Sequence, residues 1–468
     1  MNNKSKQSIT IPAEVLGFSD VEVESVTTDL RARQITIRVS STKDEILCRE
    51  CNQPTNPHGR GRLLRLRHLP ILGKETTIEI IPRRGRCPHC DGGATTTQRL
   101  DWYDTNSKFT RPYEQHLLFE LINSTVADVS RKEDVDYHAL EALIDKYIEE
   151  EIDFNTIDEI GVLGLDDISL KKGYRDFVTI VSYRCKDEVR LLAVLDGRER
   201  ATVEALLRKI PERLKQTVRA VCCDLYEGYI NASKAVFGDT VPVVADRFHV
   251  RKLYGKGLIS LRKSELKRLK KELIEIDYKN LKPVIAVLRK QKDYFTDDDK
   301  KVVEPLFNLS PKLQLAYQLS HELTTVFNSH LSPAEAKALF VEWIDRVSAS
   351  KIKCFNRFVK TLNKHMDIIA NYFIARNSSG FVEGFNNKVK VLKRRCYGLS
   401  NVTRLFQRLM LDLTGFERFN PAMAQYCTVQ REDAKSQYIP VRRQSIHLYS
   451  ATNTASSWQC GHYSFICY

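Results

Sequence analysis

Carboxylates that follow apolar runs are the first residues of this sequence that could do chemistry. The run Val162–Leu165 ends in Asp166 and Asp167, and the run Arg219–Cys223 ends in Asp224. Short apolar runs predict buried strands, and ligands of open α/β sheets bind where strands end. A strand that merely ends in solvent would show the same pattern, so the role of each acid depends on whether distant acids join it.

A third acid, Glu383, lies in a predicted helix that is otherwise basic. It is the only acid between Asp367 and Asp412. The basic residues behind it that we consider for DNA binding are Lys388, Lys390, Lys393 and Arg394. A solvated helix face is the alternative, but a lone carboxylate among cations suits a site where metal and phosphate balance the charges. Clustered carboxylates bind hard divalent cations, so the three acids together predict such a site.

Four cysteines form two Cys-x-x-Cys pairs, Cys48–Cys51 and Cys87–Cys90. Each pair can place two thiolates on one tetrahedral metal from a tight turn, and two pairs complete a four-cysteine zinc site. Four free thiols are the alternative. A structural zinc would fold this segment, which is too small to bury a core of its own.

The segment between the cysteine pairs is long and rich in arginine. We expect an inserted hairpin, with its turn at Ile71–Lys74 and a strand at Thr76–Ile81, because the gap exceeds the spacing common in zinc fingers. Arginines here alternate with leucines, which favours contact with nucleic-acid phosphates, and a solvated strand face is the alternative. The candidate residues are Arg60, Arg62, Arg65, Arg67, Arg83, Arg84 and Arg86.

The composition favours a folded protein with a polyanionic partner. The 468 residues include 73 Lys and Arg against 59 Asp and Glu, a formal net charge of +14 that favours nucleic acid. No stretch approaches the ~18 apolar residues of a membrane helix, and the first residues lack an apolar signal core. The twelve cysteines then predict reduced thiols and a metal site. We expect a cytoplasmic, nucleoid-associated protein with no membrane partner.

Two patterns precede the region of the acids. Alternating residues at Val21–Val26 and Gln34–Val39 predict a β-hairpin. Helical spacing at Arg111–Ile122, Val126–Arg131 and Tyr137–Glu150 predicts two helices around a short one. This order is typical of a helix-turn-helix unit. A plain helical linker would look the same, and the last helix carries few basic residues.

From Gly161 the predicted order is β-β-β-α-β-α-β, the order of a ribonuclease H-like sheet, which hosts metal-dependent phosphoryl transfer on nucleic acids. The remaining predicted elements are strands Phe177–Tyr183, Arg190–Leu195 and Val241–Ala245 and helices Ala201–Ile210 and Glu227–Val236. A helical insertion with a basic face follows, for which a charged solvated surface is the alternative. Its predicted helices are Lys263–Ile276, Asn280–Gln291, Pro311–Phe327, Pro333–Ser348 and Phe355–Phe373. Ser378 or Ser379 can cap the next helix, and 400–416 is the last.

Four segments give the chain a specific resemblance: Leu163–Lys172, Val221–Tyr229, Val243–Arg251 and Asn377–Gly398. The last two contain Asp-Arg-Phe-His and Glu-Gly-Phe-Asn-Asn-Lys-Val-Lys. With the order of the whole chain, they resemble the DDE-type insertion-sequence transposases of the IS-L3 family. The tail beyond about Asn420 finds no counterpart in it.

The resemblance implies an α/β protein with a ribonuclease H-like core that is preceded by a Cys₄ zinc finger and a helix-turn-helix. It implies that Asp166, Asp224 and Glu383 bind Mg²⁺ or Mn²⁺ and that Zn²⁺ is structural. The implied function is a DNA transposase that binds the terminal inverted repeats of its element, cleaves the ends and joins them to target DNA. Double-stranded DNA is the implied partner, bound by at least a homodimer. A DNA-binding regulator without catalysis and a nuclease of the same fold remain alternatives.

Two positions of the acid group stay open. The family usually has Asp-Glu where this chain has Asp166-Asp167, so we expect Asp167 to support the site. Asp246 is the alternative to Asp224 as the second carboxylate, and the position of Asp224 at a strand end favours Asp224. His249 is then a possible neighbour of the site that orients phosphate. The alternative for Asp246 to His249 is a purely structural turn after the last strand. The expected divisions are 1–105 hairpin and zinc finger, 106–155 helix-turn-helix, 156–250 first part of the core, 251–375 helical insertion, 376–418 last core helices and 419–468 loosely ordered tail.

Overall fold

A computed structural model describes the chain at residues 11–18, 20–169, 177–280, 287, 288, 290, 295–396, 399 and 401–420. The chain divides into two compact units, Met1–Asn420 and Pro421–Tyr468. Every element described below belongs to the first unit. The predicted tail from Pro421 onward and most of the predicted helix Asn280–Gln291 lie outside the described residues. Within those residues, no helix is long and apolar enough to cross a membrane.

The first strands form two sheets, one of four strands in the order β1-β2-β5-β4 and one of three in the order β3-β6-β7. Their bounds, after a 3-10 turn η1 at Ala13–Leu16, are β1 Val21–Asp29, β2 Gln34–Ser41, β3 Asn56–Arg60, β4 Leu64–Ile71, β5 Lys74–Ile80, β6 Arg83–Arg86 and β7 Thr95–Thr97. Both predicted hairpins are confirmed. The inserted hairpin does not extend the cysteine segment, because β5 pairs in parallel with β2 and completes the first sheet.

Three helices follow, α1 Arg111–Leu121, α2 Val126–Glu133 and α3 Tyr137–Tyr147, at the three predicted positions. The side chains of Thr125 and Asp136 cap α2 and α3, which explains where these helices begin. Leucines and isoleucines of α1 and α3 form one buried cluster with Val129 of α2. The three helices therefore share one core, to which Leu411 and Phe419 from the last described helix also contribute.

The central sheet has the order β10-β9-β8-β11-β12. The strands β8, β9 and β10 are antiparallel neighbours, and β11 and β12 run parallel to β8. The bounds, with a turn η2 at Phe154–Thr156 before β8, are β8 Gly161–Ser169, β9 Phe177–Cys185, β10 Glu188–Asp196, α4 Arg200–Lys209, α5 Glu212–Lys215, β11 Val218–Cys223, α6 Glu227–Phe237 and β12 Val243–Ala245. The predicted β-β-β-α-β-α-β order is confirmed, with α5 added as a short turn of helix.

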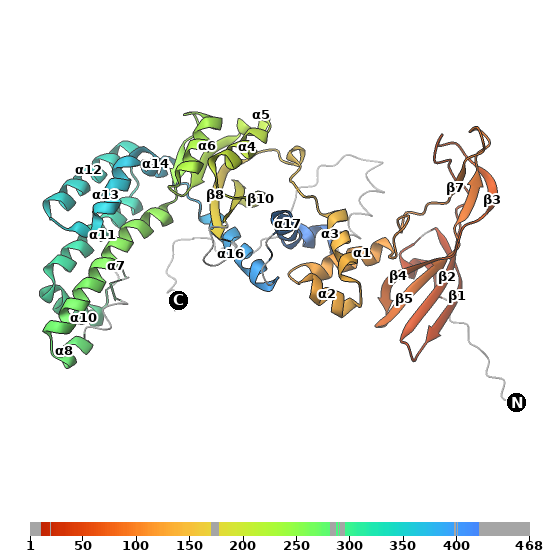
Figure 1. The fold of residues 1–468 in the computed structure, drawn as a ribbon, viewed down its shortest axis with the longest axis horizontal. Helices are drawn as coiled ribbons and strands as arrows, with labels where there is room; N and C mark the ends of the chain where they lie inside the picture. The colour runs from red at the N-terminus through yellow and green to blue at the C-terminus, as the bar shows by residue number, and fades with distance from the viewer. Residues whose placement is uncertain are drawn as a thin grey trace. The chain divides into compact units, whose positions relative to one another are not determined.

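Helices cover both faces of this sheet. Leu163 and Leu165 of β8 pack in one cluster with residues of α4 and α6. Ile168 of β8 packs in another cluster with α16 Gly380–Arg395 and α17 Val402–Phe419. Because side chains alternate along a strand, Gly164 and Ile168 face α16, whereas Leu163 and Leu165 face the other side. Figure 1 shows α4 and α6 near the strands and α16 beside β8.

The described residues between β12 and α16 are mostly helical. The helices are α7 Arg247–Glu272, α8 Glu275–Asn280, α10 Asp297–Leu309, α11 Pro311–Asn328, α12 Pro333–Ala349, a turn η4 at Lys353–Phe355, α13 Asn356–Lys364, α14 Met366–Ala370 and α15 Tyr372–Ala375. Two predictions were wrong here. The first helix begins at Arg247, not at Lys263. The segment Phe355–Phe373 is broken near His365, and Asn371 donates to the backbone oxygen of Val243.

Candidate active site

Three aspartates directly follow residues that are paired with one another across three neighbouring strands, at Leu165, Cys223 and Ala245. The last parallel pairs of β8 with β11 and of β11 with β12 lie side by side. Asp166, Asp224 and Asp246 are the next residues of these strands. Both β11 and β12 end at these paired residues, whereas β8 continues to Ser169. The sheet therefore brings the two predicted aspartates, Asp166 and Asp224, to one edge and places Asp246 beside them.

Two hydrogen bonds orient the carboxylate of Asp166. The backbone N–H of Asp167 donates to Oδ1 at 2.8 Å, and the amide Nδ2 of Asn386 donates to Oδ2 at 2.5 Å. Burial raises the pKa of Asp166 to about 6, opposed by the N–H of Asp167 and by His249. A bound cation would favour the charged carboxylate, so this acid suits a metal site.

Asp224 has fewer protein partners than its neighbour Asp246. Its Oδ1 accepts the backbone N–H of Tyr226 at 3.0 Å. Burial raises its pKa, and the positive charges of His249 and Arg198 act against this shift. The carboxylate therefore lies partly buried beside two cationic groups and keeps capacity for a further ligand.

The carboxylate of Asp246 caps the start of helix α7. It accepts the backbone N–H of Phe248 at 3.0 Å and lies 3.1 Å from Nδ1 of His249. Burial would raise its pKa, but the hydrogen bonds from His249 and Ser379 outweigh burial and lower the pKa. Ser379 precedes α16 without capping it through its side chain, contrary to one predicted option. The bond to Asp246 raises the pKa of His249, and Asp166 adds to that shift.

Helix α16 lies directly against strand β8. A Cβ on Gly164 would lie 2.3 Å from Cγ2 of Val382 and 2.8 Å from the ring of Phe381. One turn further along the helix, Asn386 reaches Asp166. The absence of a side chain at Gly164 is therefore what lets the helix approach the acidic edge.

Glu383 lies on the turn of α16 between these two contacts. Its side chain is exposed. Within the described residues, it forms no hydrogen bond or ion pair with Asp166 or Asp224. The fold places α16 beside Asp166, but the carboxylate of Glu383 does not contact the carboxylates of Asp166 and Asp224.

Asn386 and Arg198 were not predicted from the sequence, although both lie at the acids. Asn386 is 5% exposed, and its Oδ1 has no hydrogen-bond partner in the described part of the chain. A bound cation or water is the usual partner of such an atom. Arg198 lies 3.8 Å from the carboxylate of Asp167. Helical spacing from Glu383 could have indicated Asn386, whereas no sequence pattern links Arg198 to Asp167.

The four cysteines meet as predicted. Their sulfur atoms all lie within 4.8 Å of one another. In each pair the first sulfur accepts a backbone N–H two residues later, at 3.4 Å for Cys48 and 3.3 Å for Cys87. Backbone hydrogen bonds lower the pKa of Cys48 to about 6, which favours the thiolate. The cluster is compatible with a tetrahedral zinc.

The predicted DNA-contacting arginines fall into two groups. Arg65 and Arg83 pair with Glu79 and Asp44, and Nη1 of Arg67 donates to the backbone oxygen of Asp134 at 2.8 Å. Arg60, Arg62, Arg84 and Arg86 are exposed and, within the described residues, form no ion pair or side-chain hydrogen bond; Arg65 is exposed too but pairs with Glu79. The phosphate contacts predicted for these arginines stay a prediction, for which the second group is the better candidate because the first already has protein partners.

The basic residues of α16 divide in the same way. Lys393 donates to the backbone oxygen of Ser169 at 3.1 Å. Lys388 is half-buried, and burial lowers its pKa. Lys390 and Arg394 are exposed. The helix therefore presents two exposed cationic side chains, of which Arg394 also donates to the backbone oxygen of Lys390 at 3.2 Å, and holds the other two against the protein.

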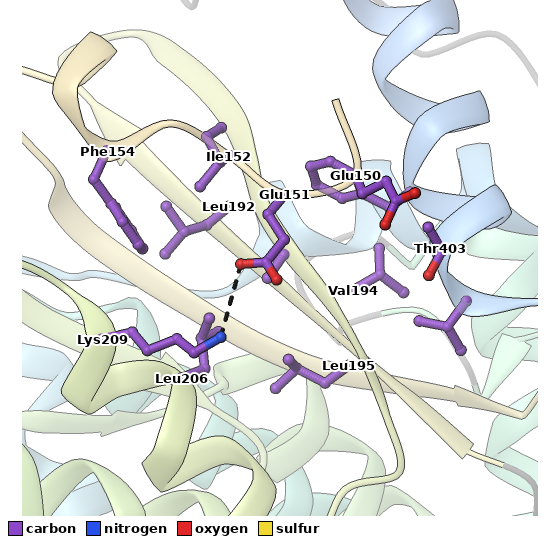
Figure 2. Close-up of a pocket in the computed structure, with 13 residues that line it drawn as sticks. Glu150, Glu151, Ile152, Phe154, Leu192, Val194, Leu195, Leu206, Lys209 and Thr403 are labelled. Carbon is purple, nitrogen blue, oxygen red and sulfur yellow. Dashed lines mark ion pairs between the residues drawn. The ribbon is translucent and has the colours of Figure 1, made fainter. Parts of the chain in front are cut away.

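A cavity of about 200 Å³ lies beside β10, the outer strand of the central sheet on the side away from β12. Figure 2 shows the ion pair of Glu151 and Lys209, 3.7 Å apart, over apolar side chains that include Leu192, Val194 and Leu206. None of the acids of the candidate site lines this cavity. Its lining offers packing surface, not a catalytic constellation.

The mixed α/β core with an acidic strand edge and the separate four-cysteine cluster define a protein with two candidate metal centres. The family model of IS-L3-type DDE transposases, described as a transposase, matches residues 163–409. The chain belongs to this family, and its match includes all the predicted acids. It is 25% identical over 388 residues to the transposase of insertion sequence element IS1001 from Bordetella parapertussis, covering 82% of this chain and 93% of that protein. It is 20% identical over 393 residues to the transposase of element IS1557 from Mycobacterium tuberculosis, covering 79% and 86%.

Proposed function

We propose that the protein binds the terminal inverted repeats of its own insertion sequence, cleaves DNA there and joins the freed ends to target DNA. The observation that carries the proposal is the position of Asp166 and Asp224 directly after paired residues of neighbouring strands, inside the segment that matches the family. Family membership alone indicates an insertion-sequence transposase. The acids at the strand ends are where we propose that DNA cleavage and joining take place.

The core is proposed to be a ribonuclease H-like fold. Its support is the sheet order with three antiparallel strands followed by two strands parallel to the first. In such a core, Asp166, Asp224 and Glu383 would hold Mg²⁺ or Mn²⁺. Bound there, the divalent cations would activate the attacking water or 3′-hydroxyl and stabilise the leaving oxygen.

The protein's own residues have distinct tasks in this proposal. Asn386 and the N–H of Asp167 fix the orientation of the Asp166 carboxylate. Asp246 holds Nδ1 of His249, so that the other ring nitrogen is available to phosphate. Glu383 completes the acid set when its exposed side chain turns towards Asp166 and Asp224.

The residues before the core are proposed to recognise the ends. Zinc held by Cys48, Cys51, Cys87 and Cys90 would fix the segment that carries Arg60, Arg62, Arg84 and Arg86. The helices α1 to α3 would act as a helix-turn-helix, with α3 presented to DNA. Pairing of two ends requires two sites, so we expect at least a homodimer on DNA.

The test uses the full-length protein, Mn²⁺ or Mg²⁺, and linear DNA that ends in the inverted repeats flanking its coding region. Wild type should bind this DNA, cleave it and give strand-transfer products. Asp166→Asn and Glu383→Gln should bind it equally well without cleaving. Asp239→Asn, an exposed acid before β12, is the matched control and should behave as wild type.

The other outcomes identify the alternatives. Binding by wild type with no cleavage in either metal would indicate a regulator without catalysis. Cleavage with no strand-transfer product would indicate a nuclease. Undiminished cleavage by Asp166→Asn would overturn the assignment of the acids.

A further inference from the structure

Arg198 reaches the acidic edge from the link between β10 and α4. Its Nη1 lies 3.8 Å from Oδ2 of Asp167. Its positive charge also acts on Asp224, where it opposes the rise in pKa caused by burial. The guanidinium is therefore part of the electrostatic environment of Asp224, which we assign to the metal site, and of Asp167, the neighbour of Asp166.

Two aromatic rings hold this guanidinium. Its central carbon lies 4.2 Å from the ring centre of Phe177, the first residue of β9, and 4.8 Å from that of Tyr226, which precedes α6. Cation–π contacts of this kind fix the plane of an arginine without using its N–H groups. The side chain is thus ordered before any ligand arrives.

The N–H groups of Arg198 remain available. Within the described residues, its guanidinium donates no hydrogen bond, and the distance to Asp167 is too long for one. The side chain is 37% exposed. Structural arginines of the same unit differ: Arg408 donates to the backbone oxygens of Leu121 and Ser124. An arginine that only tied elements together would show such bonds.

We propose that Arg198 binds a non-bridging phosphate oxygen of the DNA strand held at Asp166 and Asp224. A carboxylate edge repels a phosphodiester, and an ordered guanidinium with unused donors offsets that repulsion with geometric specificity. The inference rests on the proposed function, because it takes DNA as the ligand. It names the residue that positions the strand.

The first measurement compares single-turnover cleavage of end DNA in Mn²⁺ by Arg198→Gln, Arg198→Lys and wild type. Loss of a charge-assisted hydrogen bond should slow Arg198→Gln about 10- to 100-fold. Arg198→Lys keeps the charge but not the planar fork, so it should recover part of the rate. Arg200→Gln is the matched control two residues away, since Arg200 pairs with Glu204 on α4, and it should cleave as wild type does.

A second measurement separates a phosphate contact from a structural role. Each phosphate around the cleavage point is replaced in turn by a neutral methylphosphonate. At the contacted phosphate the replacement should slow wild type by the same factor as Arg198→Gln, and should slow Arg198→Gln little further. Equal losses for both proteins at every position, or full activity of Arg198→Gln, would overturn the proposal. If wild type binds end DNA but does not cleave it, the proposed function fails. The contact can still be tested by measuring how each methylphosphonate changes the DNA affinity of wild type and of Arg198→Gln.

Discussion

The carboxylate of Asp166 has its two oxygens held by an N–H of its own strand and by an amide from α16. That arrangement could be predicted only in part. Acids after apolar runs are visible in the sequence, because strand ends and acidic residues are local signals. The amide of Asn386 and the guanidinium of Arg198 come from elements far along the chain, and their contacts depend on how those elements pack.

Removal of the Asn386 amide should slow cleavage without weakening DNA binding. Asn386→Ala leaves Oδ2 of Asp166 without its donor, so the carboxylate loses its fixed orientation, and we expect cleavage about 10-fold slower or more. The matched control is Asn387→Ala, an exposed neighbour on the same helix. Single-turnover rates and end-DNA affinities measure both. Equal rates for the two variants would contradict the role of Asn386.

His68 in strand β4 should make the protein sensitive to acid. Burial lowers its pKa to about 4, below the ordinary value of about 6.5. Between about pH 6.5 and 4, His68 is therefore protonated in the unfolded state and neutral in the folded state. The free energy of unfolding should fall as pH drops through this range, by about 3 kcal/mol at most.

The variant His68→Asn isolates this effect. It can keep a hydrogen bond to Thr110, which lies 2.8 Å from Nδ1 of His68, but it does not titrate. Urea midpoints at pH 7 and pH 5 should differ less for the variant than for wild type. The same pH dependence in both proteins would exclude His68 as its source.

At the scale of elements, local patterns predicted most strands and helices, and non-local pairing was the part they missed. The hairpin of β4 and β5 was expected inside the cysteine segment, but β5 pairs with β2. Periodicity says which residues form a strand and nothing about which distant strand it joins. The predicted helix Phe355–Phe373 is divided into α13, α14 and α15, and its periodicity did not mark these breaks.

The close approach of α16 to β8 can be tested at Gly164. In Gly164→Ala the new Cβ would lie 2.3 Å from Val382, so the helix must shift. We expect a loss of about 1 to 3 kcal/mol in the free energy of unfolding, together with slower cleavage because Asn386 moves with the helix.

The control for this substitution is Gly384→Ala in α16. A Cβ at Gly384 meets no atom within 4 Å, and alanine favours a helix by up to about 1 kcal/mol over glycine. Thermal unfolding and end-DNA cleavage should therefore be unchanged or improved. A stable, fully active Gly164→Ala would show that the approach of α16 does not govern the site.

At the scale of the first unit, α17 joins the three-helix region to the helix of Glu383. Asp412 of α17 accepts the backbone N–H of Asn123 at 2.9 Å and a hydrogen bond from Arg395 of α16 at 2.5 Å. Arg408 of α17 donates to backbone oxygens at the end of α1 and before α2. Asp412 thus links the turn between α1 and α2 to α16, and Arg408 adds two bonds to the region of α1 and α2.

Asp412→Asn should destabilise the unit. The Asp412 side chain is 1% exposed, so the substitution leaves Arg395 without its buried counter-charge, and we expect a loss of about 3 kcal/mol. Glu417→Gln, on an exposed position of the same helix, should change little. Urea midpoints measure both. Similar midpoints for Asp412→Asn and wild type would mean that this ion pair does not support the contact.

The most direct test of the central claim is Mn²⁺-dependent cleavage of end DNA by three isosteric variants, Asp166→Asn, Asp224→Asn and Asp246→Asn. If Asp166 and Asp224 hold the catalytic cation, both of their variants should lose about 10³-fold or more in rate, whereas Asp246→Asn should lose less, because Asp246 acts through His249 and the start of α7. Cleavage that survives Asp224→Asn but is abolished by Asp246→Asn would contradict the account.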